Sequence, residues 1–192
     1  MKYLTVGTNE IRDDLFRNIE NTESIKPRGG LWLTQYDERI KDYNHWVDFI
    51  LMHPNILFYK TKNGSPWVQP CSVVNLNEDT KLFSLDSVDN LDFLMNNYPL
   101  DDQKFSYQKL SKDYDGIYVD LGHLFHDNYD YKMRENFSSF GVSSLVLFNL
   151  DCIDYYQAGN VIIEPFDYED SLNFDRYYQI DYSDVKKKVL KK

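Results

Sequence analysis

Cysteine is scarce in this chain: the 192 residues include only Cys71 and Cys152, and no CxxC motif occurs. Both cysteines lie among apolar residues, so we interpret them as buried free thiols in a reducing compartment. Long apolar runs are also missing, because no window approaches the roughly 18 apolar residues of a membrane-spanning helix. The opening MKYLTVGTNE lacks the apolar centre of a signal peptide. We therefore expect a cytoplasmic protein without a transmembrane helix.

Basic residues are few outside one short stretch. The chain has 21 Lys and Arg against 31 Asp and Glu, and five of the lysines fall within residues 186–192. Without that stretch the body carries 16 basic residues against 31 acidic ones. Such a surface repels phosphate backbones and anionic lipid headgroups, which argues against nucleic-acid binding and membrane-surface binding. A protein target or a small molecule remains as the partner.

The strong short motifs of several enzyme classes are absent. No P-loop, GxGxxG, HExxH, GxSxG or EF-hand pattern occurs, which argues against most nucleotide hydrolases, Rossmann enzymes, zincins and α/β-hydrolases. His123 and His126 form an HxxH pair that could supply half of a metal site on a helix. The surrounding residues are typical of turns, and the sequence pattern does not indicate a third metal ligand. We therefore predict no metal site.

The remaining composition favours an α+β fold. Hydrophobic residues make up 42% of the chain and aromatic residues 16%, which is enough for a sizeable core. Asp outnumbers Glu by 23 to 8, and Asp suits turns and helix caps better than helix interiors. The length corresponds to one domain. We predict a single α+β domain over residues 1–185 with a mostly antiparallel sheet, followed by a basic tail or frayed helix over 186–192.

The apolar patterns place the elements along the chain. Alternating or short apolar runs predict strands, and apolar residues at helical spacing predict helices. We expect strands over residues 3–7, 31–36, 55–60, 66–76, 144–150 and 160–166. We expect helices over residues 10–21 and 42–53, and a third, capped by Ser87, after a strand that begins near residue 82.

Two carboxylates stand out from the many acidic residues. Glu164 follows the apolar run 161–163, where a buried acid is costly unless it has a partner or a function. Asp151 closes the most apolar run, 144–150. A solvent-facing strand end explains Glu164 equally well, and a turn or cap explains Asp151. Both are candidate catalytic residues.

The segment KPRGGLWLTQY is the most specific one in the chain. Gly29 and Gly30 permit close approach of a ligand or a neighbouring strand. In the strand that follows, Trp32, Thr34 and Tyr36 alternate onto one face. Two aromatic rings flanking a hydroxyl can stack on a flat ring and hold it by a hydrogen bond. An ordinary strand that packs Trp32 into the core gives the same pattern.

Three segments in this order resemble a group of bacterial and phage proteins related to mono-ADP-ribosyltransferases. They are KPRGGLW, YDGIYV and SSLVLFNLDCI, and the opening YLTVGT is similar to the first strand of that group. The resemblance covers most of residues 3–155. It implies a split antiparallel sheet with a few flanking helices that holds NAD in a cleft.

The resemblance also implies roles for individual residues. The backbone of Gly7 and Thr8 would lie near the nicotinamide amide, Thr34 would support the site, and Trp32 or Tyr36 would stack on the nicotinamide. A carboxylate would hold the ribose and stabilise positive charge as nicotinamide leaves. The sequence departs from the group in two places: Val6 stands where an Arg or His is expected, and GVSS at 141–144 lacks an acid. Glu164 could supply the carboxylate only if its strand lines the cleft, and Asp151 is its competitor for that role.

Two hypotheses of function follow. The first is an ADP-ribosyltransferase-like protein that transfers ADP-ribose from NAD to a macromolecular target. The second is an acidic inhibitor of the phage type, which imitates nucleic acid and blocks a basic protein surface such as that of a CRISPR effector. The order of the motifs favours the first hypothesis. The charge and the missing Arg or His favour the second.

Overall fold

A computed structural model describes residues 1–37, 39, 43–51, 53, 63–101, 104–126, 137–165 and 178–191. Their helices and strands form an α+β fold in which antiparallel pairs predominate, as the sequence predicts. The chain divides into two compact units. Unit 1 comprises residues 1–12, 34–76 and 153–192, and unit 2 comprises residues 13–33 and 77–152. Strand β2 (Leu31–Asp37) gives its first three residues to unit 2 and the rest to unit 1.

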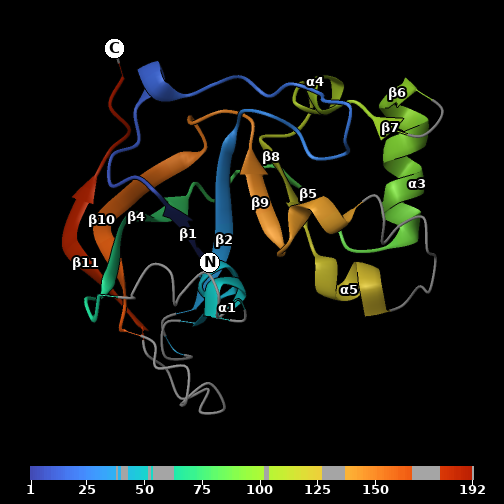
Figure 1. Cartoon of the computed structure of the whole chain (residues 1–192). Helices are drawn as coiled ribbons and strands as arrows, with labels where there is room; N and C mark the ends of the chain where they lie inside the picture. The colour runs from blue at the N-terminus through green and yellow to red at the C-terminus, as the bar shows by residue number, and fades with distance from the viewer. Residues whose placement is uncertain are drawn as a thin grey trace. The chain divides into compact units, whose positions relative to one another are not determined.

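Unit 1 is built on antiparallel strands. Strand β1 (Lys2–Val6) pairs with β2 on one side and with β4 (Trp67–Leu76) on the other. Beyond β4 follow β10 (Ile153–Ile163) and β11 (Tyr178–Lys187), drawn in orange and red in Figure 1. The short β3 (Tyr43–Asn44) pairs with β2. All these pairs are antiparallel, so the strands can be joined without long crossovers.

One face of this sheet carries the core of unit 1. Leu4, Val73 and Val161 lie in one buried cluster with Val47 and Ile50 of helix α1 (His45–Leu51). Asn44 begins the helix, because its Oδ1 accepts hydrogen bonds from the backbone N–H groups of residues 46 and 47 at 3.0 and 3.2 Å. The cap fixes the N-terminus of the predicted helix.

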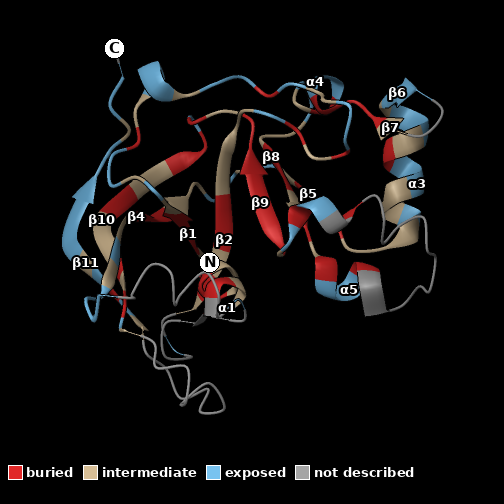
Figure 2. Ribbon diagram, viewed as in Figure 1, coloured by how far each residue is buried: buried red, intermediate tan, exposed pale blue. Residues whose placement is uncertain are grey.

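Unit 2 has its own sheet. Strand β9 (Ser144–Leu147) lies between β2 and β8 (Gly116–Val119), and β5 (Leu82–Leu85) runs parallel to β8. Every residue of β9 is buried, which Figure 2 shows in red. Helix α3 (Val88–Asn97) begins at the predicted cap, where Ser87 accepts a hydrogen bond from the N–H of Asn90 at 3.3 Å.

Short elements complete the described part of unit 2. They are η1 (Asp13–Leu15), the β6–β7 pair (Pro99–Asp101 and Lys104–Phe105), α4 (Tyr107–Leu110), α5 (Leu121–His126) and η3 (Ser138–Phe140). They enclose an aromatic-rich core that contains Phe83, Phe105 and Phe137. Six of the 16 buried residues of this cluster are aromatic, and each buries a large apolar area.

Several predicted elements differ from the structure. The helix expected over residues 10–21 is wrong: only η1 is helical there, and the apolar side chain of Leu15 is 67% exposed. Residues 121–126, whose sequence is typical of turns or extended chain, form helix α5 instead. The basic tail is not helical, since β11 continues to Lys187 and Leu190 N–H donates to the Ile11 carbonyl at 3.1 Å. The strand expected over 55–60 lies outside the described residues.

Candidate functional site

A loop over residues 20–28 closes on itself in unit 2. The backbones of Glu20 and Arg28 exchange two hydrogen bonds, of 2.9 and 3.0 Å. Inside the loop the Thr22 hydroxyl donates to the Lys26 carbonyl at 2.8 Å. Side chains of Asp, Asn, Ser and Thr favour turns because they bond to nearby backbone groups. The loop therefore has a defined shape of its own.

Helix α4 anchors the same loop. The Asn21 Oδ1 accepts from the Tyr107 N–H at 2.9 Å, and its Nδ2 donates to the Ser106 hydroxyl at 3.1 Å. The Tyr107 hydroxyl donates to the Ile25 carbonyl at 2.9 Å. Tyr107 is 2% exposed, and burial raises the pKa of its phenol well above the ordinary value. It stays a hydrogen-bond donor over the whole physiological pH range.

The double glycine lets two backbone stretches touch. Gly29 and Gly30 have φ of +73° and +69°, and the Gly30 N–H donates to the Arg17 carbonyl at 2.8 Å. A Cβ on Gly29 would lie 2.1 Å from the Asn18 carbonyl oxygen. Only glycine fits there. The contact also explains why residues 17–20 are not helical, since backbone groups that a helix would use are bonded to residues 28 and 30.

A pocket of about 610 Å³ lies beside this contact. We call it the Trp32 pocket. It is lined by Arg17, Asn18, Glu20, Lys26, Pro27, Arg28, Gly29 and Trp32. The Trp32 indole is fixed by a hydrogen bond from its Nε1 to the Gly29 carbonyl at 3.0 Å and by contact with the Phe140 ring, 5.5 Å between centroids. The volume of the Trp32 pocket lies in the range of pockets that hold small molecules, about 300–1,000 Å³.

Three cations gather at the Trp32 pocket within an acidic unit. Unit 2 contains 18 Asp and Glu against nine Lys and Arg. Among the described residues neither the Arg17 nor the Arg28 guanidinium has a hydrogen-bond or ion-pair partner. The Lys26 ammonium lies 4.7 Å from the Trp32 ring centre, and burial lowers its pKa from the ordinary 10.5. Unpaired cations beside an aromatic ring are suited to an anionic ligand that carries a flat ring.

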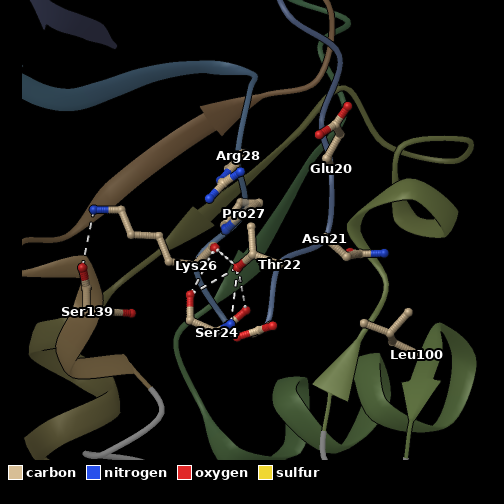
Figure 3. Close-up of a pocket in the computed structure, with 10 residues that line it drawn as sticks. Glu20, Asn21, Thr22, Ser24, Lys26, Pro27, Arg28, Leu100 and Ser139 are labelled. Atoms are coloured by element: carbon tan, nitrogen blue, oxygen red, sulfur yellow. Dashed lines mark hydrogen bonds between the residues drawn. The ribbon is translucent and has the colours of Figure 1, made fainter.

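A second hollow, of about 960 Å³, shares Glu20, Lys26, Pro27 and Arg28 with the Trp32 pocket. Figure 3 shows Lys26 reaching towards Ser139, whose carbonyl oxygen accepts from its Nζ at 3.2 Å. Because Lys26 lines both hollows and covers the Trp32 ring, its position decides how much of that ring a ligand can reach.

Two of the motifs that carry the resemblance meet in unit 2. The Asn149 Nδ2 of SSLVLFNLDCI donates to the Asp115 Oδ1 of YDGIYV at 2.9 Å. The other carboxylate oxygen of Asp115 accepts from the Lys81 N–H at 2.9 Å. Asn149 Oδ1 accepts from the N–H of Asp151 at 3.0 Å. These polar side chains hold the ends of β5, β8 and β9 together, which is a structural role.

The other predicted nucleotide-binding residues lie in unit 1. Gly7, with φ +105°, and Thr8 form the turn after β1, where the Gly7 N–H donates to the Pro70 carbonyl at 2.7 Å. Thr34 is 6% exposed and accepts from Asn44 Nδ2 at 2.7 Å. Tyr36 is 3% exposed and packs edge-on against the Tyr182 ring. Trp32, Thr34 and Tyr36 thus alternate along β2 as expected, but each has protein contacts of its own.

The two predicted catalytic carboxylates do not line the Trp32 pocket. Glu164 is exposed, one residue after β10 in unit 1, and Asp151 is exposed in unit 2. Glu20 is the carboxylate that does line it. Sequence analysis missed Glu20 and Arg17. The available signal was three cations within residues 17–28 of an otherwise acidic region.

The histidine pair has a local explanation. Asp120 caps α5, because its Oδ1 accepts from the His123 N–H at 3.2 Å, and its Oδ2 lies 2.9 Å from His123 Nδ1. Within the described ranges, no three His, Cys, Asp or Glu side chains lie close enough to hold a metal ion. No helix in the described part of the chain has the length and apolar character needed to span a membrane.

Comparison with protein-family models, with curated proteins and with solved structures finds no match for this chain.

Proposed function

We propose that unit 2 binds a phosphate-bearing nucleotide in the Trp32 pocket, and that this nucleotide is NAD. The observation that carries the proposal is a pair of guanidinium groups, Arg17 and Arg28, that line one pocket with an indole ring and have no partner among the described residues. Guanidinium groups bind phosphate oxygens in bidentate geometry, and an indole face stacks on a base or on nicotinamide. The KPRGGLW segment supplies Lys26, Arg28, Gly29 and Trp32 to this pocket, which agrees with its place in the resemblance.

The acidity of unit 2 does not oppose such binding. Salt at physiological strength screens exposed charges beyond about 8 Å, so distant carboxylates act weakly on a ligand in the pocket. Arg17, Lys26 and Arg28 act at contact distance, where Glu20 is the one opposing charge among the described lining residues. Two free thiols, both buried, agree with the reducing environment of the cytoplasm, where NAD is abundant.

Transfer of ADP-ribose to a protein target is the reaction we propose for the bound NAD. The bond between ribose C1′ and the nicotinamide nitrogen breaks, and its electron pair neutralises the positive ring as nicotinamide leaves. A nucleophile of the target bonds to C1′ and loses its proton. A carboxylate stabilises the positive charge that develops on the ribose. Glu20 lines the Trp32 pocket and is the first candidate for that carboxylate. Glu164 and Asp151, which the sequence predicts for this role, do not line the pocket and are the alternatives.

Binding is tested first, by calorimetric titration of the whole chain with NAD. The double variant R17A/R28A is expected to weaken NAD binding about 10- to 100-fold, because two charge-assisted contacts are lost. The matched control K81A/K112A removes two cations of unit 2 from outside the pocket and should leave the affinity within about twofold. Equal affinities in the two variants, or no heat of binding with the unmodified chain, would contradict the proposal.

Turnover is tested separately by release of nicotinamide in the presence of host lysate. The variants E20Q, E164Q and D151N each keep the shape of a side chain and remove its charge. The essential carboxylate is the one whose change abolishes release while calorimetry still shows NAD binding. A variant that loses no more than about threefold in rate, roughly 0.7 kcal/mol of barrier, excludes its residue.

A second function, the acidic inhibitor, is favoured by the uneven charge. Unit 1 is nearly balanced, with 13 acidic and 12 basic residues, so the excess of acid lies in unit 2. Exposed Asp89 and Asp92 of α3 belong to that excess. If unit 2 imitates nucleic acid, D89N/D92N should slow association with a partner captured from host lysate, and D181N/D184N on β11 of unit 1 should not. An association rate that does not change between about 50 and 200 mM salt would exclude this function.

A further inference from the structure

The hollow of about 960 Å³ beside the Trp32 pocket differs from it in charge. We call it the Glu23 hollow. The charged residues common to the two cavities are Glu20, Lys26 and Arg28. The Trp32 pocket adds the cation Arg17, whereas the Glu23 hollow adds the carboxylate Glu23. Among the described lining residues, three cations thus face one carboxylate in the Trp32 pocket, and two face two in the Glu23 hollow.

The carboxylate of Glu23 is available to a ligand. It is exposed and has no hydrogen-bond or ion-pair partner among the described residues; Lys104 Nζ donates to the backbone carbonyl of the same residue. The hydroxyl groups of Thr22 and Ser24, by contrast, are used within the 20–28 loop, where both donate to the Lys26 carbonyl, at 2.8 and 3.2 Å (Figure 3). Glu23 is therefore the charged group by which a ligand can distinguish this hollow from the Trp32 pocket.

An apolar side chain lines the Glu23 hollow as well. Leu100 of β6 is 44% exposed, so part of its surface remains open to a ligand. A flat base can pack on such an apolar surface. The adjacent 2′- and 3′-hydroxyl groups of a ribose can donate to the two oxygens of one carboxylate. Leu100 and Glu23 together suit a nucleoside, which is uncharged, and the cations of the Trp32 pocket suit phosphate groups.

We propose that NAD spans both cavities, with its nicotinamide nucleoside in the Trp32 pocket, its adenosine in the Glu23 hollow, and its adenosine ribose donating to the Glu23 carboxylate. The proposal rests on NAD binding in unit 2. The pyrophosphate then lies between the nucleosides, at the shared cations Lys26 and Arg28. Glu23 accordingly selects NAD over NADP. In NADP the 2′-oxygen of this ribose carries a phosphate of charge about −1.5 to −2, which replaces a hydroxyl donor with a like charge.

The reverse orientation would give the opposite selectivity. With adenosine on Trp32, the 2′-phosphate of NADP would lie in the cavity that holds Arg17, and guanidinium groups bind phosphate. NADP would then bind more tightly than NAD. The ratio of the two affinities therefore reports which nucleoside occupies the Glu23 hollow.

The test is calorimetric titration of the whole chain with NAD and with NADP. NADP should bind about tenfold more weakly than NAD, or weaker still, because of the like charge. In E23Q the affinity for NAD should fall about 5- to 10-fold, since a charge-assisted contact is replaced by a neutral one. The two affinities of E23Q should differ by no more than about threefold. Its melting temperature should stay that of the unmodified chain, because an exposed carboxylate without a partner adds little to stability.

A gain of affinity separates selectivity from damage to the fold. E23R places a guanidinium group where the 2′-phosphate would lie, so it should bind NADP more tightly than NAD. The matched control E78Q removes an exposed carboxylate of unit 2 that lines neither cavity. It should keep the ratio of the two affinities within about twofold of that of the unmodified chain.

The outcomes distinguish this proposal from NAD binding itself. If the unmodified chain binds NAD, but binds NADP equally or more tightly, the proposed orientation is overturned and NAD binding in unit 2 stands. An E23Q variant that keeps the original ratio, or an E23R variant that still prefers NAD, would overturn the role of Glu23. No heat of binding with either dinucleotide would contradict NAD binding in unit 2, and this proposal with it.

Discussion

The two units of the chain differ in their balance of acidic and basic residues. Unit 1 has nearly equal numbers of acidic and basic residues, whereas unit 2 has twice as many acidic as basic ones. Yet unit 2 holds the pocket with three cations, Arg17, Lys26 and Arg28. Net charge describes long-range attraction and repulsion, and a ligand in a pocket responds to the charges within contact distance. The sign of a whole surface is therefore a poor guide to what one pocket on it binds.

The units also differ in what supports their candidate sites. In unit 1 a pocket of about 490 Å³ is lined by Lys2, Tyr36 and Asn75, which are paired across β1, β2 and β4, so the sheet register places its side chains. The Trp32 pocket of unit 2 is formed by the 20–28 loop, which depends on a close backbone contact at Gly29 and on the anchors from α4. A substitution at one backbone position can disrupt a site on a loop, whereas a site on a sheet is held in place by the hydrogen bonds of several paired strands.

The largest expected effect comes from that backbone position. Gly29→Ala should destabilise unit 2 by roughly 3–5 kcal/mol, because the methyl group adds a clash with the Asn18 carbonyl to the strain of a positive φ. Gly64 of unit 1 is the matched control: its φ is +71°, and apart from its chain neighbours no atom of the described residues lies within 4 Å of an added Cβ. Gly64→Ala should cost about 1–2 kcal/mol from the backbone strain alone. Urea unfolding measures both, and equal losses would show that the contact at Gly29 relaxes freely.

Substitution of one asparagine in each unit shows how much a hydrogen-bonded side chain contributes to the free energy of unfolding. Asn44 in unit 1 is fully buried; it caps α1 and donates to Thr34 Oγ1 and to the Gln35 carbonyl. Asn44→Ala should cost about 3 kcal/mol, from the lost cap and from two buried groups left without a donor. Asn149 in unit 2 is partly exposed, so water can replace some of its bonds. Asn149→Ala should cost about 2 kcal/mol.

Urea unfolding of both variants and of the unmodified chain gives the two losses of unfolding free energy and shows which is larger. A larger loss in Asn149→Ala would mean that the Asn149 side chain supports more of unit 2 than its three hydrogen bonds, with Asp115, Asp151 and Cys152, suggest.

Much of the strand pattern could be predicted from the sequence, and the reason is local. The buried strand 144–147 is a continuous apolar run. The helix after Ser87 and the helix before residue 53 each have apolar residues at helical spacing and a capping side chain. The predicted helix over residues 10–21 failed because its backbone groups bond to residues far along the chain, such as Gly30. Local propensity gives way to tertiary contacts of this kind.

The candidate site was predicted only in part. KPRGGLW was chosen for its glycines and aromatic residue, and in the structure it lines the Trp32 pocket. Arg17 and Glu20 precede that segment and join the pocket only through the close contact at Gly29 and the pairing of Glu20 with Arg28. No spacing rule links these positions, because the loop between them has no regular period.

Each unit contains one buried cysteine, so thiol labelling can report the local opening of each unit separately. Cys71 belongs to unit 1 and Cys152 to unit 2; burial, together with nearby Asp181 and Asp115 respectively, raises the pKa of each thiol to about 12. Labelling at pH 8 therefore requires local opening. In single-thiol variants, C152S and C71S, NAD at ten times its Kd should slow labelling of Cys152 about tenfold, or by about 1.4 kcal/mol, and leave that of Cys71 unchanged. Equal slowing of both thiols would show that the units open together and would break the comparison.

The smallest expected effect concerns Lys26, which stands over the Trp32 ring in unit 2. Burial lowers its pKa below 10.5 in the folded chain. Between that lowered pKa and 10.5 the unfolded chain binds more protons than the folded one, so the contribution of Lys26 to stability rises with pH. Lys26→Met keeps the stem that packs on Trp32 and removes the titration. The free energy of unfolding of the unmodified chain minus that of Lys26→Met should therefore increase from pH 7 to pH 10. Taking this difference cancels the opposing contribution of Tyr98, whose pKa is raised to about 12 by burial and by Asp113. A flat difference would show that the Lys26 ammonium is as well hydrated in the pocket as in the unfolded chain, and Lys26 would then act on a bound nucleotide as an ordinary surface charge.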